Sequence, residues 1–172
     1  MNIPAAPAVE EARERLRGIG GVSVPGDVHL TLRFLGDVKA EKIKELSGRM
    51  RSLEGHRPFS VSMRGLGAFP NIRDPRVVWI GADMEEGFYD ILSDLDGILE
   101  KSSISYDKKP FKAHVTIGRV KTPSRGLTDL LGKEKGLEAG SFVCSEIFLM
   151  GSKLAPGGAV HSVIDSFRLA RD

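Results

Sequence analysis

The sequence predicts one compact domain of mixed helices and strands in which a single unit occurs twice. Its 172 residues are 41% hydrophobic and 28% charged, the balance of a globular protein rather than of a disordered or fibrous one. Each half of the chain has the order helix, strand, helix, strand, strand. The first strand of each half carries the pattern His-x-Thr-x, at residues 29–32 and, 85 residues later, at 114–117. A duplicated unit is the simplest account of both observations.

The first half is predicted to contain a helix, a loop, a strand, a second helix and two further strands, at residues 7–17, 18–26, 27–35, 39–54, 58–66 and 76–82. The first helix has a proline near its start, acidic residues before basic ones and Gly18 after its end. The segment that contains His29 alternates in polarity and is rich in β-formers, which predicts a strand. The second helix has apolar residues at 43, 46, 50 and 53, the spacing of an amphipathic helix.

The second half repeats this order, with elements at residues 85–101, 111–120, 124–135, 141–150 and 160–169. The first of them is an amphipathic helix, because its apolar residues stand at 88, 91, 92, 95, 98 and 99. The third is a short helix with Ser124 as its N-cap. The other three are strands. No long linker interrupts the chain, so we expect the two halves to pack as one body.

Composition excludes several classes of protein. The chain has 25 Lys and Arg and 23 Asp and Glu, which gives a net charge of +2. This charge excludes a strongly cationic protein that coats nucleic acid, but it is compatible with a local basic cleft. The single cysteine, Cys144, allows neither an internal disulfide nor a cysteine-rich metal site. No apolar run approaches the roughly 20 residues of a membrane helix, and the N-terminal residues lack the apolar stretch of a signal peptide. We therefore expect a soluble, cytoplasmic protein.

The two motifs place an imidazole and a hydroxyl on one face of each predicted strand. Side chains two residues apart in a strand point the same way, so His29 accompanies Thr31 and His114 accompanies Thr116. The intervening aliphatic residues point toward a core. The chain has four His and four Thr, and half of each fall in these motifs, which disfavours chance. Duplication for structure alone, without function, is the remaining alternative.

Two imidazoles that face one cleft suit acid–base catalysis. Histidine titrates near pH 6.5, so near neutrality one ring can carry a proton while the other is free. One ring then accepts a proton from an attacking oxygen, and the other gives a proton to the leaving oxygen of an in-line displacement. Threonine hydroxyls are uncharged donors that suit the non-bridging oxygens of a phosphate. The pattern therefore predicts phosphodiester chemistry that requires no metal.

Other catalytic designs have no support in the sequence. The patterns His-x-His, His-Glu-x-x-His and Cys-x-x-Cys are absent, so a metal site would have to be assembled from scattered residues. The glycine-rich phosphate loop that ends in Gly-Lys-Ser or Gly-Lys-Thr is absent too, and so is a Gly-x-Ser-x-Gly nucleophile turn. We expect no metal ion and no cofactor.

Three basic residues near the motifs are candidate phosphate contacts. Arg33 and Lys112 share strand parity with the motif residues, and each either contacts a phosphate or is simply solvated. Arg119 has the wrong parity for a regular strand. Gly118 immediately before it permits a β-bulge that would turn Arg119 toward the cleft.

The remaining candidates have a structural interpretation that we prefer. Phe34 and Trp79 could stack on a base, but both lie in apolar segments, which favours core packing. His56 and His161 lack a threonine partner, and we expect them to be exposed. Cys144 lies in an apolar strand, so we expect it to be inert.

The motif segments closely resemble the two-histidine phosphoesterase superfamily, and within it the RNA 2′,3′-cyclic phosphodiesterases historically called 2′-5′ RNA ligases. HLTLRFLGDV (29–38) resembles the first motif block of this family and FKAHVTIGRV (111–120) the second. The segments at 67–81 and 148–167 resemble its intervening and C-terminal segments, so the resemblance covers nearly the whole chain. Relatives usually begin with a strand of the type Arg-x-Phe-Val-Ala-[Ile/Val], most of which is missing here before NIPAAP. We expect this departure to affect local stability more than catalysis.

The resemblance implies an α+β fold that is bilobal and internally duplicated, with antiparallel sheets lining a central cleft and helices outside. Residues 1–172 would form a single domain of two pseudo-symmetric lobes, with one motif in each. We expect this domain to be a monomer.

The resemblance also implies hydrolysis of a 2′,3′-cyclic phosphate to a 2′-phosphomonoester. His29 corresponds to the proton donor and His114 to the proton acceptor, while Thr31, Thr116 and Arg119 correspond to phosphate ligands. The implied partner is RNA with a cyclic phosphate end, such as a tRNA fragment, or a cyclic nucleotide. Reversible 2′-5′ RNA ligation would use the same groups. The alternative from another class is a module that binds RNA ends or nucleotides without turning them over.

Overall fold

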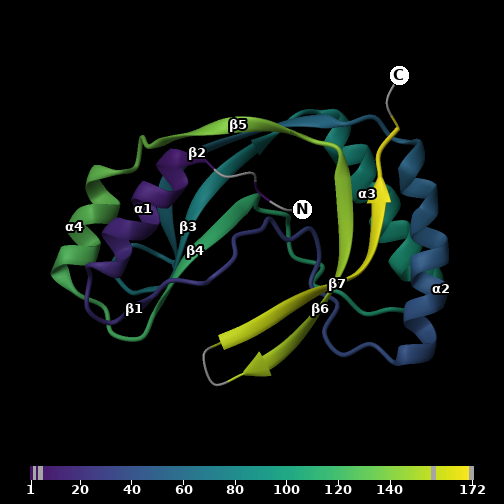
Figure 1. The fold of residues 1–172 in the computed structure, drawn as a ribbon, viewed down its shortest axis with the longest axis horizontal. Coiled ribbons are helices and arrows are strands. Elements are labelled where there is room, and N and C mark those ends of the chain that lie inside the picture. Colours follow the sequence, from purple (N-terminus) through teal and green to yellow (C-terminus); the bar gives the residue numbers. More distant parts are fainter. Residues whose placement is uncertain (2, 4–5, 156–157, 171–172) are drawn as a thin grey trace.

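A strongly curved antiparallel sheet forms the centre of the protein, with helices packed at both ends and a two-stranded ribbon below (Figure 1). The computed structural model describes residues 1–172 apart from 2, 4–5, 156–157 and 171–172. The helices are α1 (Pro7–Arg17), α2 (Ala40–Met50), α3 (Gly87–Lys101) and α4 (Arg125–Lys133), with a 3₁₀ turn, η1, at Arg51–Gly55. The strands are β1 (Val22–Ser23), β2 (Phe59–Pro70), β3 (Pro75–Met84), β4 (His114–Val120), β5 (Glu138–Cys144), β6 (Glu146–Ala155) and β7 (Gly158–Arg168).

The large sheet combines strands from both halves of the sequence. Its order is β1-β4-β3-β2-β5, every neighbouring pair is antiparallel, and β6 pairs with β7 as a separate ribbon. One face of the sheet packs against α1, where the side chains of Leu16, Val22 and Val78 all lie close to Gly118. This architecture of antiparallel sheets with helices outside confirms the predicted α+β fold class.

Local sequence patterns predicted the positions of the four described helices, although the helix predicted at 39–54 ends at Met50 and continues as the 3₁₀ turn η1. α1 has the predicted bounds, and the six apolar positions expected to face the core from α3 are all buried: Phe88, Ile91, Leu92, Leu95, Ile98 and Leu99. Burying an aliphatic side chain of this size contributes about 1.5–3 kcal/mol, so this face alone is a large part of the core. Ser124 caps α4 as predicted, because its Oγ accepts a hydrogen bond from the Leu127 N–H at 3.3 Å. No described helix has the length and hydropathy to cross a membrane.

Two predictions about the strands are wrong. The segment 141–150 is not one strand: β5 ends at Cys144 and β6 begins at Glu146, in a different sheet. The short strand β1 lies inside the predicted loop at 18–26, where Val22 pairs with Val120. Both errors concern which strands pair with each other, and strand pairing is not determined by the local sequence.

The predicted strand at 27–35 is also wrong. Among the described residues of this segment, only Leu30 forms a bridge with the large sheet, opposite Val115, and its backbone N–H and C=O also pair with Met1. The remaining edge of β4 is used by β1, which pairs with residues 119–120. Beyond Leu30 the segment runs beside irregular chain, where the Phe34 carbonyl accepts a hydrogen bond from the N–H of Asp107 at 3.2 Å. A strand needs a continuous ladder, which this segment does not form with β4.

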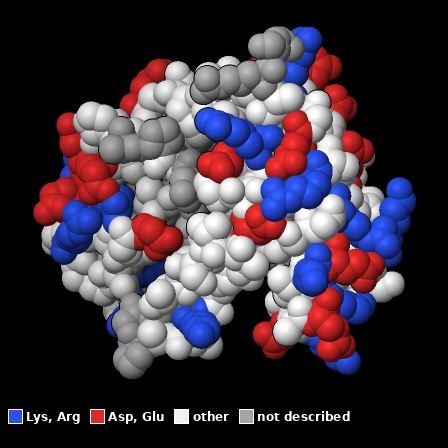
Figure 2. All heavy atoms as spheres, turned by 45° about the vertical axis from the view of Figure 1, so that its right-hand side comes forward, with Lys and Arg blue, Asp and Glu red and all other residues white. Residues whose placement is uncertain are grey.

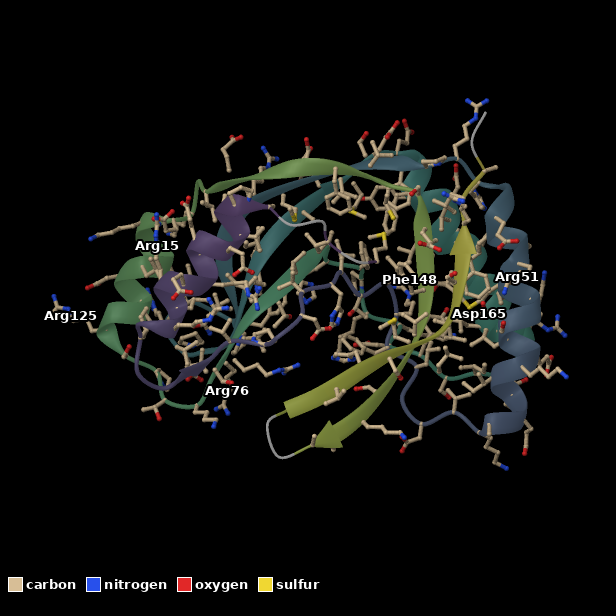
Figure 3. All side chains as sticks on the ribbon, viewed as in Figure 1. Arg15, Arg51, Arg76, Arg125, Phe148 and Asp165 are labelled. Atoms are coloured by element: carbon tan, nitrogen blue, oxygen red, sulfur yellow. The ribbon has the colours of Figure 1, made fainter. Side chains whose placement is uncertain are left out.

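An ion pair ties the ribbon to the helical end of the fold. Arg51 of η1 and Asp165 of β7 point toward each other (Figure 3), with Nη2 of Arg51 2.6 and 2.7 Å from the two carboxylate oxygens. The same guanidinium lies 4.8 Å from the ring centre of Phe167. These contacts fix the root of β7, the strand that carries His161.

Candidate active site

The single bridge between Leu30 and Val115 sets the two motifs side by side. The bridge is antiparallel, so one step along each chain brings His29 opposite Thr116 and Thr31 opposite His114. Leu30 and Val115 are fully buried, whereas all four motif side chains are partly exposed on the other face. In such a ladder the two histidines are diagonal neighbours, about 7–8 Å apart. In this register each histidine lies opposite the threonine of the other motif.

Arg119 lies on the same face as the second motif because of a bulge in β4. Thr116 pairs with Trp79 and Gly118 with Val78, so one residue of β4 is extra at this point. After the bulge Arg119 pairs with Val77, which shares a face with Trp79. The bulge expected at Gly118 is therefore present, and it turns the exposed guanidinium of Arg119 to the side of Thr116.

His114 is held by one hydrogen bond to the backbone. Its Nδ1 lies 2.7 Å from the carbonyl oxygen of Lys112, and a carbonyl only accepts, so Nδ1 carries the proton. In the neutral ring the lone pair is then on Nε2. Phe69 packs against the ring edge to face, with the ring centres 5.0 Å apart. A neutral His114 ring therefore has its unprotonated nitrogen, Nε2, on the side away from the Lys112 carbonyl.

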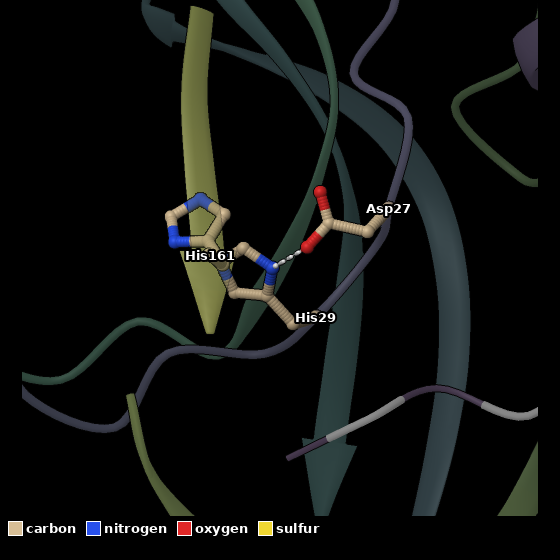
Figure 4. Close-up of side chains that lie close together, drawn as sticks. All are labelled: Asp27, His29 and His161. Carbon is tan, nitrogen blue, oxygen red and sulfur yellow. Dashed lines mark ion pairs between the residues drawn. The ribbon is translucent and has the colours of Figure 1, made fainter. Parts of the chain in front are cut away.

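His29 has a different environment, made of a carboxylate and a second imidazole (Figure 4). Its Nδ1 lies 3.3 Å from Oδ2 of Asp27, an ion-pair contact without hydrogen-bond geometry, so this buried nitrogen has no hydrogen-bond partner among the described residues. The ring of His161 on β7 packs edge to face on His29, with centres 4.7 Å apart. Burial lowers the pKa of His29, the nearby His161 lowers it further, and Asp27 partly opposes both.

Aromatic side chains form a wall beside His114. Phe69 and Trp79 lie on the same sheet face, with ring centres 5.2 Å apart. The indole lies directly over Gly67, where a Cβ would come within 2.2 Å of it. Trp79 thus packs on the backbone of β2 rather than in the main core, and the expectation of core packing holds only in part.

Arg33 is not simply solvated, because Asp96 of α3 holds its guanidinium, although Arg33 also lines a cavity beside the first motif. Its guanidinium forms two hydrogen bonds with Asp96 of α3, at 2.7 and 2.8 Å, and lies near the rings of Tyr106 and Phe111. Parity predicted otherwise because it assumes a regular strand beyond Thr31, which the chain does not form. Lys112 is exposed, and the contact it makes with the site is through its carbonyl oxygen.

Several other predictions need correction. Phe34 is 64% exposed rather than packed in the core. His56 and His161 are half-buried rather than exposed: His56 pairs with a carboxylate and His161 contacts His29. Cys144 is buried as expected, and burial raises the pKa of its thiol, which keeps it protonated and unreactive.

The surface around the motifs is open and mixed in charge. A cavity of about 660 Å³ lies beside the first motif, between residues 29–38, α2 and the ribbon; His29 and Thr31 line it, but His114 does not. His29 therefore borders this cavity, whereas His114 lies outside it. On the face drawn in Figure 2, Lys and Arg alternate with Asp and Glu instead of forming one basic patch.

Comparisons of sequence identify similar proteins. A family model described as LigT like Phosphoesterase matches residues 3–79. The RNA 2′,3′-cyclic phosphodiesterase of Methanothermobacter thermautotrophicus is 38% identical over 148 residues, which cover 84% of this chain and 80% of that protein. The RNA 2′,3′-cyclic phosphodiesterase of Archaeoglobus fulgidus is 34% identical over 161 residues, 92% of this chain and 90% of its own.

Solved structures show the same fold. A crystal structure of a Thermus thermophilus protein matches with a TM-score of 0.78 and 30% identity, over 94% of this chain and 90% of that one. The crystal structure of E. coli LigT complexed with 3′-AMP matches with a TM-score of 0.71 and 26% identity, over 97% and 95%.

Proposed function

The chain belongs to the LigT-like phosphoesterases of the two-histidine superfamily and is a hydrolase, and from that premise we propose that it converts RNA 2′,3′-cyclic phosphate ends to 2′-phosphomonoesters. The observation that carries the proposal is the antiparallel register at Leu30 and Val115, because it sets both His-x-Thr motifs on one surface. The names of the relatives support the substrate class.

In the proposed reaction a water molecule attacks phosphorus in line with the bond to the 3′ oxygen. His114 accepts the proton of the water through Nε2, the nitrogen left free by the hydrogen bond of Nδ1 to the backbone. His29 gives its proton to the departing 3′ oxygen as that bond breaks. The 2′ bond remains, which yields a 2′-phosphate, and exchange with solvent restores both histidines.

The phosphate would be held by uncharged and charged donors together. Thr31 and Thr116 offer hydroxyls to the non-bridging oxygens, and Arg119 offers a guanidinium that the bulge turns to the same face. No step requires a metal ion or a cofactor. A bound phosphodiester also favours the imidazolium form of His29, since a nearby negative charge opposes the effect of burial on its pKa.

The nucleoside next to the phosphate would stack on the wall of Phe69 and Trp79. E. coli LigT, 26% identical to this chain, is complexed with 3′-AMP in its crystal structure, which supports a nucleotide as the class of ligand. Reversible 2′-5′ ligation would use the same groups, with the 5′-hydroxyl of a second RNA in place of water. We further propose that residues 1–172 act as one two-lobed, monomeric domain in the cytoplasm, on RNA ends such as those of tRNA fragments or on cyclic nucleotides.

The test uses an oligoribonucleotide that ends in a 2′,3′-cyclic phosphate, incubated with excess chelator and analysed by phosphorus NMR. His29→Ala and His114→Ala should each lose activity by at least about 100-fold, the lower end of what a general acid or base contributes. His56→Ala is the matched control, because His56 also pairs with a carboxylate, Asp94, but lacks the motif.

A 2′-phosphate formed by the unchanged protein and by His56→Ala, but not by the two motif variants, supports the proposal. A 3′-phosphate product would overturn the assignment of the leaving oxygen. Substrate that binds and stays intact would instead favour the recognition module, which needs the same pocket without turnover.

A further inference from the structure

We propose that Asp27, His29 and His161 bind a divalent transition-metal ion, with Zn²⁺ the best fit, and that this ion removes His29 from its role in hydrolysis. The first half of this inference stands on the geometry of the three side chains. The second half rests on the proposed function. His161 matches no residue of the His-x-Thr motifs, and it reaches His29 only because the ribbon folds under the large sheet (Figures 1 and 4).

The three side chains are close to the spacing of a zinc site. One ligand atom from each residue lies within 4.8 Å of the other two. Zinc bonds of about 2.0–2.1 Å in tetrahedral geometry put ligand atoms about 3.3 Å apart. Nδ1 of His29 and Oδ2 of Asp27 already have this separation, at 3.3 Å. The separations within the group thus exceed those of a tetrahedral zinc site by at most about 1.5 Å.

The donor set selects the class of ion. Two imidazoles and one carboxylate, with a fourth position left to water, form the ligand set of open zinc sites. Mg²⁺ and Ca²⁺ prefer oxygen ligands throughout and do not fit it. The Nδ1 of His29 is buried and has no hydrogen-bond partner among the described residues. A bound metal ion would give this nitrogen a partner.

Metal binding at this nitrogen is incompatible with the proton transfer proposed for His29. A ring with metal on Nδ1 can lose its Nε2 proton only by becoming imidazolate, which is far less favourable than the loss of a proton from imidazolium. The ion would also hold the ring toward Asp27 and His161. Zn²⁺ should therefore inhibit hydrolysis, and a chelator should restore it.

Binding is measured first, without any reference to activity. Untagged, metal-stripped protein is titrated with Zn²⁺ against a chromophoric chelator, and Co²⁺ serves as a spectroscopic probe because its visible bands are intense in a tetrahedral site. We expect one ion per chain. The four histidine ring signals in ¹H–¹³C NMR should divide into two groups, with His29 and His161 shifted while His56 and His114 are unchanged.

Variants identify the ligands. His161→Asn and Asp27→Asn should each weaken Zn²⁺ binding by at least roughly 10- to 100-fold, the loss that even an outer-shell partner causes. His56→Asn is the matched control, because His56 and Asp94 form a histidine–carboxylate pair, 2.8 Å apart, that lacks a second imidazole. Circular dichroism checks that each variant is folded.

Four outcomes would overturn all or part of the inference. Unchanged affinity in folded His161→Asn and Asp27→Asn would refute the ligand set, as would a shift of the His114 signal on binding. Absence of any stoichiometric binding would refute the site. If Zn²⁺ binds at these residues without inhibiting hydrolysis, the metal site is supported and its proposed effect on His29 is refuted. If the protein shows no hydrolysis even without Zn²⁺, the result counts against the proposed function and not against the metal site.

Discussion

The contact between Arg33 and Asp96 provides a direct test of which charged residues near the first motif are structural. Strand parity alone placed Arg33 beside His29 and Thr31, whereas the structure pairs it with α3. The perturbation is Asp96→Ala, which leaves the guanidinium in place and removes its partner. Arg33→Met and the double variant Arg33→Met/Asp96→Leu complete a thermodynamic cycle.

The expected loss follows from burial. The Arg33 side chain is only 11% exposed and that of Asp96 28%, and two hydrogen bonds of 2.7 and 2.8 Å join them. Removing one member of a fully buried pair costs about 3–5 kcal/mol, because the other charge is left without a partner. Water reaches Asp96 in part, so we expect a smaller loss of about 2–3 kcal/mol for Asp96→Ala. At roughly 2–4 °C per kcal/mol for a domain of this size, Tm should fall by about 4–12 °C. The double variant should recover most of the loss, since neither charge then remains.

Urea unfolding followed by circular dichroism gives the free energies, and kcat/KM on a cyclic-phosphate substrate is measured below Tm. Arg64→Met is the matched control: its pair with Asp83 is as short, at 2.6 Å, but both side chains are more than half exposed, so the loss should be about 0–1 kcal/mol. Arg33→Met should keep kcat/KM within about threefold of the original. A tenfold or larger fall in kcat/KM with unchanged stability would refute a purely structural role and indicate that Arg33 contacts the substrate.

Three other predictions concern the site itself. Gly67→Ala would put a Cβ within 2.2 Å of the indole of Trp79, so we expect the free energy of unfolding to fall by about 1–3 kcal/mol and the fluorescence emission of the single tryptophan to change. An emission spectrum like that of the original protein would contradict this prediction. Arg119→Gln should reduce kcat/KM by roughly 10- to 100-fold through a higher KM, whereas a change in kcat alone would speak against a role in phosphate binding. The pKa of His29 is lowered in the folded state, so just below pH 6.5 the folded protein binds fewer protons at this residue than the unfolded chain does, and the free energy of unfolding should rise with pH in this window. His29→Gln should flatten this dependence, measured by urea unfolding in the presence of a chelator. An unchanged slope in the variant would show that other groups cause the dependence.

The parts of the fold that follow from local spacing could be predicted, and the parts that depend on distant partners could not. The apolar face of α3 and the cap at Ser124 are set by residues within a few turns of each other, so the sequence determines them directly. The irregular path after Leu30 depends on β1 occupying part of the β4 edge, and the bridge partner of Leu30 on that edge, Val115, is 85 residues away along the chain. The contact between His161 and His29 depends on how the ribbon folds, and no spacing rule for a strand contains that information.

The surroundings of the two motifs, near in sequence at Asp27 and Lys112 and distant at His161, make the motifs chemically different. An antiparallel register of two identical His-x-Thr strands would by itself give two equivalent histidines, each opposite the threonine of the other. A general acid and a general base need unlike environments, and the sequence of the motif cannot supply them. Here the backbone carbonyl of Lys112 fixes the tautomer of His114, while burial, Asp27 and His161 act on His29 alone. We infer that the division of labour between the histidines is set by the segments around the motifs, so exchanging those surroundings should alter the pH profile more than exchanging the motifs themselves.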